Sequence, residues 1–261
     1  MRWSIPNTRI ALKWMFVLQI TIAVGMVVLT AASHVSIPTG FPRKVTEYTP
    51  VKPGDQSRPY EVRQFRQVQD ENNPAFQLPN PASLPDKLEF SMQSDAELGE
   101  VLVLSGQIEE GDSKRLSAFL DDLPLPPDYL SFHSPGGIVS EAIRIGGIAR
   151  ERELNTVLFP NSICLSSCPY AFAGGLERAA FTDAIVGLHQ HYFDQSKLLP
   201  AVFAVEAIQR GQAMTMEHLQ EMGVDPAISI LAMKTAPEDL YILLPEELEA
   251  YKLATRILEG G

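Results

Sequence analysis

The chain has 261 residues, which is enough for one large domain or two small ones. It carries 21 Lys and Arg residues against 32 Asp and Glu residues, a formal net charge of -11 at pH 7. An acidic surface repels the phosphate backbone of nucleic acids, so nucleic acid is excluded as an expected partner.

An uncharged apolar run at residues 14–32 predicts a membrane anchor. Its 19 residues are close to the roughly 20 that a helix needs to cross a bilayer. All the basic residues nearby precede it, within residues 1–13, which places the N-terminus in the cytoplasm and the rest of the chain across the inner membrane, in the periplasm or outside the cell. A cleaved signal peptide is the alternative, because Thr30-Ala31-Ala32 resembles a processing site. Both interpretations export the C-terminal part.

Residues 33–88 hold nine of the twenty prolines, scattered among polar and charged residues. Proline at this density prevents long helices and inner sheet strands. The segment therefore predicts an extended linker that leads to a folded domain at residues 89–261. A strap that binds a partner is the alternative interpretation.

Short apolar runs alternate with helical patterns in the folded domain. Strands are predicted at residues 101–104, 129–132, 156–159 and 184–188. Helices are predicted at residues 112–123, 138–149 and 201–222. This alternation predicts an α/β fold with a mostly parallel sheet, whose polar loops gather at the carboxyl ends of the strands.

Three polar segments at these strand ends carry the groups that acyl transfer needs. Ser166 precedes a predicted helix, whose backbone N–H groups would favour a developing negative charge. Gly136-Gly137 lacks side chains, so a backbone N–H can approach a substrate carbonyl closely. His189 ends a strand and is a base that titrates near neutral pH. Each signal alone fits an ordinary turn or a surface histidine, but the combination predicts a catalytic site.

The order and spacing of these motifs resemble the proteolytic subunit of the Clp protease, over roughly residues 89–257. The resemblance is carried by Leu104-Ser105-Gly106-Gln107-Ile108, Ser134-Pro135-Gly136-Gly137, Ser166, Arg178 and His189-Gln190. It implies the repeated ββα spiral fold that this family shares with the crotonases. Cys164-Leu165-Ser166-Ser167-Cys168 resembles most the Cys-x-Ser-x-Cys pattern of exported bacterial Clp-like proteins.

The resemblance also implies a role for each matching residue. Ser166 matches the nucleophile and His189 matches the general base. The N–H groups of Gly137 and Ser167 match the pair that forms the oxyanion hole.

The third catalytic position departs from the family pattern. The family's aspartate falls on Thr235, which cannot stabilise an imidazolium as a carboxylate does. Asp239 and Glu238 lie nearby in the sequence and are the expected substitutes, with a serine–histidine dyad as the alternative. A lysine base, Lys197 or Lys234, is a further alternative, because related signal peptide peptidases use one.

Cys164 and Cys168, the only cysteines, bracket the predicted nucleophile. In an oxidising compartment they predict a disulfide that would fix the turn around Ser166. Two buried thiols, or a zinc site completed by His189 and His191, are the alternatives. No metal and no cofactor are expected.

The sequence therefore predicts a membrane-anchored serine hydrolase outside the cytoplasm, acting on a peptide or polypeptide. An inactive Clp-like binding or scaffold protein is the alternative, motivated by Thr235. A crotonase-type acyl-thioester enzyme is disfavoured, because coenzyme A is scarce outside the cytoplasm. The apolar face of residues 201–222 would pack or oligomerise, which is compatible with a homo-oligomer.

Overall fold

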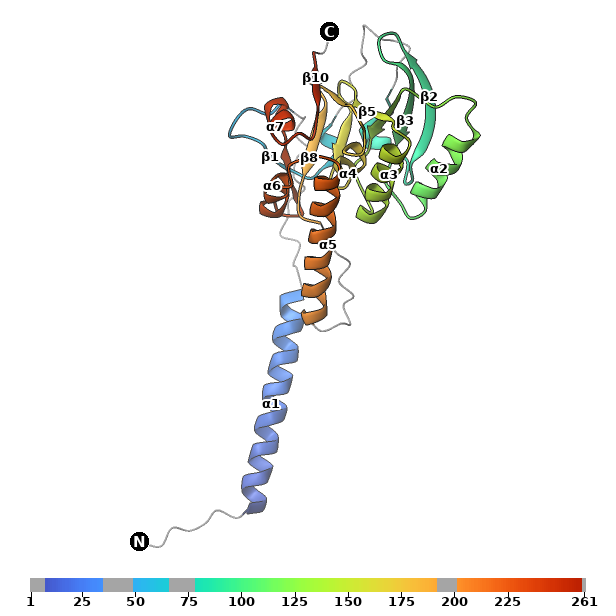
Figure 1. Ribbon diagram of the computed structural model, residues 1–261. Coiled ribbons are helices and arrows are strands. Elements are labelled where there is room, and N and C mark those ends of the chain that lie inside the picture. Colours follow the sequence, from blue (N-terminus) through green and yellow to red (C-terminus); the bar gives the residue numbers. More distant parts are fainter. Residues whose placement is uncertain (1–7, 35–48, 66–77, 192–200, 260–261) are drawn as a thin grey trace. The chain divides into compact units, whose positions relative to one another are not determined.

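The computed structural model describes residues 8–34, 49–65, 78–191 and 201–259 of the chain. Its helices and strands are labelled in Figure 1. The chain divides into two compact units, Met1–Lys44 and Val45–Gly261, and each is described by itself.

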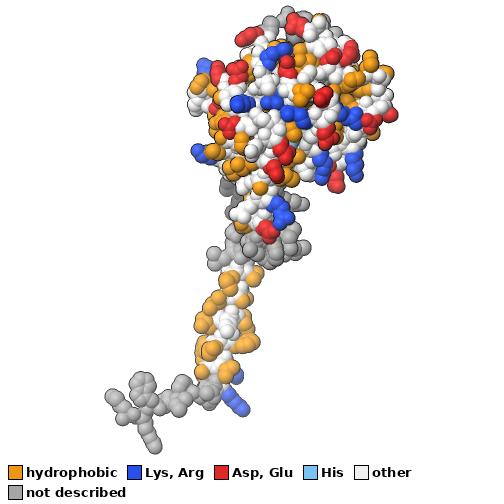
Figure 2. Space-filling view, viewed as in Figure 1, with side chains coloured by type: hydrophobic (Ala, Val, Ile, Leu, Met, Phe, Trp, Pro, Cys, Tyr) orange, Lys and Arg blue, Asp and Glu red, His pale blue; other side chains and the backbone are white. Residues whose placement is uncertain are grey.

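The described part of the first unit is the helix α1 (Thr8–His34). Within it, Arg9–Val28 has a mean hydropathy of 1.9 and no buried residue. Figure 2 shows hydrophobic side chains along this helix and basic side chains near its N-terminal end. By length and composition it can cross a membrane, and a signal sequence has the same properties. The predicted apolar helix is thus confirmed, although it begins at Thr8 and not at residue 14.

A six-stranded mixed sheet forms the larger part of the second unit, in the order β10-β7-β5-β4-β3-β2. Its strands are β2 (Glu89–Asp95), β3 (Gly99–Ser105), β4 (Tyr129–His133), β5 (Asn155–Leu158), β7 (Arg178–Phe181) and β10 (Arg256–Leu258). Only the β2–β3 pair is antiparallel. Residues 101–104 of β3 are buried on both faces, which explains their continuous apolar run.

A second mixed sheet has four strands in the order β1-β9-β8-β6. Its strands are β1 (Ser57–Pro59), β6 (Ile163–Leu165), β8 (Ile185–Leu188) and β9 (Asp239–Ile242). Strands β6 and β8 are parallel, whereas β9 runs antiparallel to both β8 and β1. The carboxyl ends of β6 and β8 lead directly to Ser166 and His189.

Helices α2 (Asp112–Asp122) and α3 (Val139–Glu151) lie beside the six-stranded sheet (Figure 1). The helices that follow in this unit are α4 (Cys168–Phe172), α5 (Ala201–Glu221), α6 (Ile228–Lys234) and α7 (Pro245–Ala250). Leu102 and Leu130 of the sheet share one core cluster with Leu116 of α2 and Ile145 of α3. The helix α4 is buried over its whole length and places Ser166 at its N-terminal end.

The described part of the predicted linker belongs to this folded unit. It contains β1 and two short 3-10 helices, η1 (Val62–Gln64) and η2 (Pro81–Ser83). Phe65, only 2% exposed, packs in a cluster with Ile163 and Leu165 of β6. The prediction of an extended linker is therefore wrong for residues 49–65 and 78–88. Pro59 is tolerated in β1 because this is an edge strand, where a missing N–H leaves no inner ladder bond unmade.

Most predicted elements are present, but their grouping differs. The strands predicted at residues 101–104, 129–132, 156–159 and 184–188 correspond to β3, β4, β5 and β8. The helices predicted at residues 112–123, 138–149 and 201–222 correspond to α2, α3 and α5. The mostly parallel α/β arrangement is confirmed for the six-stranded sheet, whereas β8 belongs to the second, mixed sheet together with β6. With three residues, β6 is too short to give a recognisable pattern.

Candidate active site

Ser166 occupies a sharp turn between β6 and α4. Its φ of 60° lies in the left-handed region, which is unusual for a residue with a side chain and is enriched at functional sites. Its N–H donates to the carbonyl of Gly187 at 2.9 Å, so the parallel strand β8 holds the turn. Ser166 is 9% exposed, which leaves its hydroxyl in a sheltered but reachable position.

His189 lies beside this turn because β6 and β8 are parallel neighbours, with Leu165 opposite Gly187. The Nε2 of His189 is 2.7 Å from the Oγ of Ser166. The predicted nucleophile and base are therefore brought into hydrogen-bond contact, the geometry that a serine–histidine pair requires.

The surroundings of His189 favour its neutral form. Burial lowers the pKa of its imidazole, and the backbone of Pro237 offsets part of this effect. A neutral imidazole with its proton on Nδ1 leaves Nε2 able to accept the hydroxyl proton of Ser166. Nδ1 is buried and has no hydrogen-bond partner among the described residues.

None of the expected acids hydrogen-bonds to His189 in the described part of the chain. The hydroxyl of Thr235 donates to the carbonyl of Leu231 at 2.9 Å. Asp239 and Glu238 have no side-chain hydrogen bond to His189, whose two ring nitrogens are accounted for above. The described residues thus form a dyad.

Among the described residues, the lysine alternative Lys234 makes no hydrogen bond to the nucleophile. The hydroxyl of Ser166 hydrogen-bonds to His189, and no hydrogen bond joins it to Lys234. Lys197 lies outside the described residues.

The glycine loop 134–137 packs directly on the nucleophile turn. The N–H of Ser134 donates to Ile163 at 2.8 Å, and its carbonyl accepts from Leu165 at 3.0 Å, which joins the ends of β4 and β6. Gly136 has a φ of 98°, and a Cβ placed there would lie 2.6 Å from the Cβ of Ser166. Only glycine allows this close approach.

The two predicted oxyanion donors flank this contact. The N–H groups of Gly137 and Ser167 make no hydrogen bond to a described residue. Unpaired N–H groups beside a nucleophile can accept the charge that develops on a carbonyl oxygen. The carbonyl of Ile108 lies against Gly137, 2.1 Å from where a Cβ would be, and so fixes this part of the loop.

Cys164 and Cys168 form a disulfide with a Cα–Cα distance of 5.1 Å, as predicted. Both cysteines are fully buried. The bond joins the middle residue of β6 to the first residue of α4 and so closes a short loop around Ser166. The zinc alternative is wrong, since both sulfurs are bonded and the described residues contain no His, Cys, Asp and Glu cluster for a metal.

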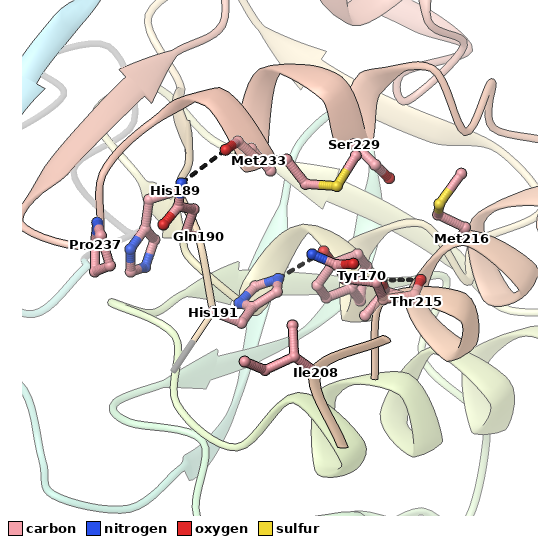
Figure 3. Close-up of a pocket in the computed structure, with 12 residues that line it drawn as sticks. Tyr170, His189, Gln190, His191, Ile208, Thr215, Met216, Ser229, Met233 and Pro237 are labelled. Atoms are coloured by element: carbon pink, nitrogen blue, oxygen red, sulfur yellow. Dashed lines mark hydrogen bonds between the residues drawn. The ribbon is translucent and has the colours of Figure 1, made fainter. Parts of the chain in front are cut away.

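A pocket of about 360 Å³ opens beside His189 (Figure 3). Its lining combines apolar and polar side chains, and comes from α4, α5, α6 and the residues that follow β8 and α6. Ile208, Met216 and Met233 are among the apolar side chains that line it. Such a pocket, next to a reactive serine, suits an apolar group of a substrate.

The polar side chains of this pocket belong to Tyr, His, Gln, Thr and Ser residues. Burial, with a smaller effect of His189, lowers the pKa of His191 to about 4. The Nε2 of His191 hydrogen-bonds with the hydroxyl of Tyr170 at 2.7 Å (Figure 3). The described residues that line the pocket include no Lys, Arg, Asp or Glu.

Tyr60 is a site residue that the sequence did not reveal. Its ring lies 4.9 Å from the ring of His189 in an edge arrangement, and its hydroxyl donates to the carbonyl of Pro135. A single tyrosine in a proline-rich segment carries no motif. Only the pairing of β1 with β9 brings it to the site.

No protein-family model matches the chain, and no curated protein matches it in sequence. The fold and the site define the class: an α/β protein with a serine–histidine pair beside a glycine loop. The likeness to the Clp proteolytic subunit rests on the sequence motifs.

Proposed function

We propose that this chain is a membrane-anchored serine hydrolase that acts through an acyl-enzyme on Ser166. The observation that carries the proposal is the 2.7 Å contact between Oγ of Ser166 and Nε2 of His189, with two unpaired N–H groups alongside. The positive φ of Ser166 and the tight fit of Gly136 support it, because such strain is retained mainly where it serves a reaction.

The reaction proceeds in two halves. The Oγ of Ser166 attacks a carbonyl carbon while Nε2 of His189 takes the hydroxyl proton. The N–H groups of Gly137 and Ser167 stabilise the oxyanion. Collapse of this intermediate breaks the bond to the leaving group, which receives the proton from His189. Water then repeats the sequence and releases the acid product and Ser166.

Turnover is expected to be slow for a serine hydrolase. Loss of a functional triad carboxylate lowers kcat by about 10⁴-fold in the well-characterised case. His189 has no carboxylate on Nδ1 among the described residues. A slow second half makes the acyl-enzyme accumulate, so a burst of product is the expected kinetic signature.

The proposed substrate is a peptide or polypeptide with an apolar side chain at the carbonyl to be attacked. The pocket of about 360 Å³ beside His189 has room for a side chain of the size of leucine or methionine. Its described lining includes no Lys, Arg, Asp or Glu, so an acidic or basic side chain would lack a counter-charge there, which would make its burial costly.

We also propose the spiral fold of the Clp and crotonase families for residues 89–261, and an exported position for this domain. The basic residues Arg2, Arg9 and Lys13, which precede the apolar run, support this orientation. A phosphatase reporter that is active only outside the cytoplasm, fused after Gly261, should be active. An inactive fusion at normal expression contradicts the orientation.

The activity is tested with full-length protein in detergent and chromogenic peptide esters that end in leucine, methionine or aspartate. We expect a burst with the two apolar esters, and none with the Ser166→Ala or His189→Ala variant. Ser162→Ala is the matched control, because Ser162 is buried near the start of β6 and its hydroxyl has no partner among the described residues. It should keep the burst of the wild type.

The absence of an acid on His189 favours one second candidate, a non-catalytic binding protein with the same fold. That candidate predicts no burst from any ester and no difference between wild type and Ser166→Ala. Apolar peptides would still bind in the pocket, with an affinity that Met233→Asp lowers.

A further inference from the structure

Tyr60 is held at the site by the main chain. Strand β1 pairs with β9, with Pro59 opposite Asp239, and the N–H of Tyr60 donates to the carbonyl of Glu238 at 2.8 Å. The segment is anchored again five residues later by the buried side chain of Phe65. The position of Tyr60 therefore does not depend on its own side chain.

The side chain of Tyr60 touches two parts of the site. Its ring meets the His189 ring edge-on at 4.9 Å, with 61° between the planes. Its hydroxyl donates to Pro135, the residue before Gly136 in the glycine loop. Burial raises the pKa of Tyr60 to about 12, and Ser166 offsets part of this effect. One side chain thus contacts the base and the glycine loop.

His189 needs such a contact, because no carboxylate among the described residues fixes its ring. In a triad, the carboxylate on Nδ1 holds the imidazole in its orientation and tautomer. Here Nδ1 has no partner among the described residues, and Nε2 bonds only to the serine that it must activate.

We propose that Tyr60 is a positioning residue that takes over the orienting role of the missing acid. Its ring packs His189 against Ser166, and its hydroxyl holds the glycine loop through Pro135. This inference rests on the proposed hydrolase function for its effect on rate, but the orientation of His189 is measurable without activity.

The tests use Tyr60→Ala and Tyr60→Phe in the full-length protein, with the rate of fluorophosphonate labelling as the first readout. A shift of about 1 Å in a catalytic group costs about 100-fold in rate, so we expect a loss of this order for Tyr60→Ala. Tyr60→Phe keeps the ring and loses one hydrogen bond, so it should retain most of the rate, within about tenfold of wild type.

The second readout is the pKa of His189, followed by NMR of labelled histidine and assigned with His189→Gln. The groups that face His189 are Tyr60, Ser166, His191 and the backbone of Pro237. Loss of the Tyr60 ring admits water, so Tyr60→Ala should raise the pKa of His189 towards its ordinary value. Tyr60→Phe should leave it low.

Tyr241→Phe is the matched control. Tyr241 lies on β9, where its hydroxyl accepts from Gln56 at 2.7 Å and donates to Glu247 at 2.7 Å. Like Tyr60→Phe, this variant removes a tyrosine hydroxyl that links residues 49–65 to the rest of the domain by a hydrogen bond. It leaves the surroundings of His189 unchanged. It should match the wild type in labelling and in the pKa of His189.

The outcomes separate the two claims. If wild type is not labelled but Tyr60→Ala still raises the pKa of His189, the hydrolase proposal fails and the positioning role stands. If Tyr60→Ala leaves both readouts unchanged, or Tyr241→Phe changes them equally, the positioning role is refuted.

Discussion

Replacing Gly136 with alanine should disable the site with little damage to the rest of the fold. At its φ of 98° an alanine is strained by about 1–2 kcal/mol. The added Cβ would lie 2.5 Å from the carbonyl oxygen of Leu165 and 2.6 Å from the Cβ of Ser166. An ordinary contact is about 3.4 Å or longer, so the glycine loop and the nucleophile turn must separate by nearly 1 Å.

The two effects together give the expected magnitude. Strain and overpacking, which costs about 1–3 kcal/mol, lower the free energy of unfolding by roughly 2–5 kcal/mol. The displacement should slow fluorophosphonate labelling of Ser166 by about 100-fold, since reacting groups tolerate little misplacement. Denaturant unfolding followed by circular dichroism measures the first quantity, and labelling of the folded protein measures the second.

Gly111→Ala separates strain from contact. Gly111 has a φ of 87° at the start of α2, and a Cβ there meets no atom within 4 Å. This variant should lose only the strain, about 1–2 kcal/mol, and should be labelled at the wild-type rate. Labelling of folded Gly136→Ala at the wild-type rate would refute the reasoning.

Three further predictions concern the general base His189, the Cys164–Cys168 disulfide and the candidate acids. Labelling should fall on acidification with a midpoint below pH 6.5, because burial lowers the pKa of His189 and the protonated ring cannot accept a proton; a midpoint above 6.5 contradicts this. Replacing Cys164 and Cys168 with alanine should lower the free energy of unfolding by about 2 kcal/mol and slow labelling, and an unchanged melting curve would show that the disulfide braces nothing. Asp239→Asn and Glu238→Gln should change labelling by less than about threefold, whereas a true triad carboxylate would cost about 10⁴-fold.

The sequence predicted those features whose cause is local. A charge-free apolar run suffices for α1, and a doubly buried strand such as β3 is a continuous apolar run. The proximity of Ser166 and His189 was predictable because both residues follow strands, and because the glycine loop, the serine and the histidine occur in the order of a known family. The proximity of two cysteines four residues apart likewise favours a disulfide.

The features that the sequence missed depend on pairing between distant segments. Strand β1 is three residues long and ends in proline, so only its partner β9, about 180 residues away, makes it a strand. Tyr60 reaches His189 through that pairing alone. The third catalytic residue could not be predicted for a related reason. Asp239 was a candidate because it lies close to Thr235 in the sequence, but whether its side chain reaches His189 depends on the orientation of β9 and of the turn before it.

The most direct measurement is the site of covalent labelling. Full-length protein in detergent is treated with a fluorophosphonate, digested and analysed by mass spectrometry, beside Ser166→Ala and Ser162→Ala. We predict one adduct, on Ser166, absent from Ser166→Ala and retained by Ser162→Ala. An unlabelled wild type, or equal labelling of Ser166→Ala, would contradict the assignment of Ser166 as the nucleophile.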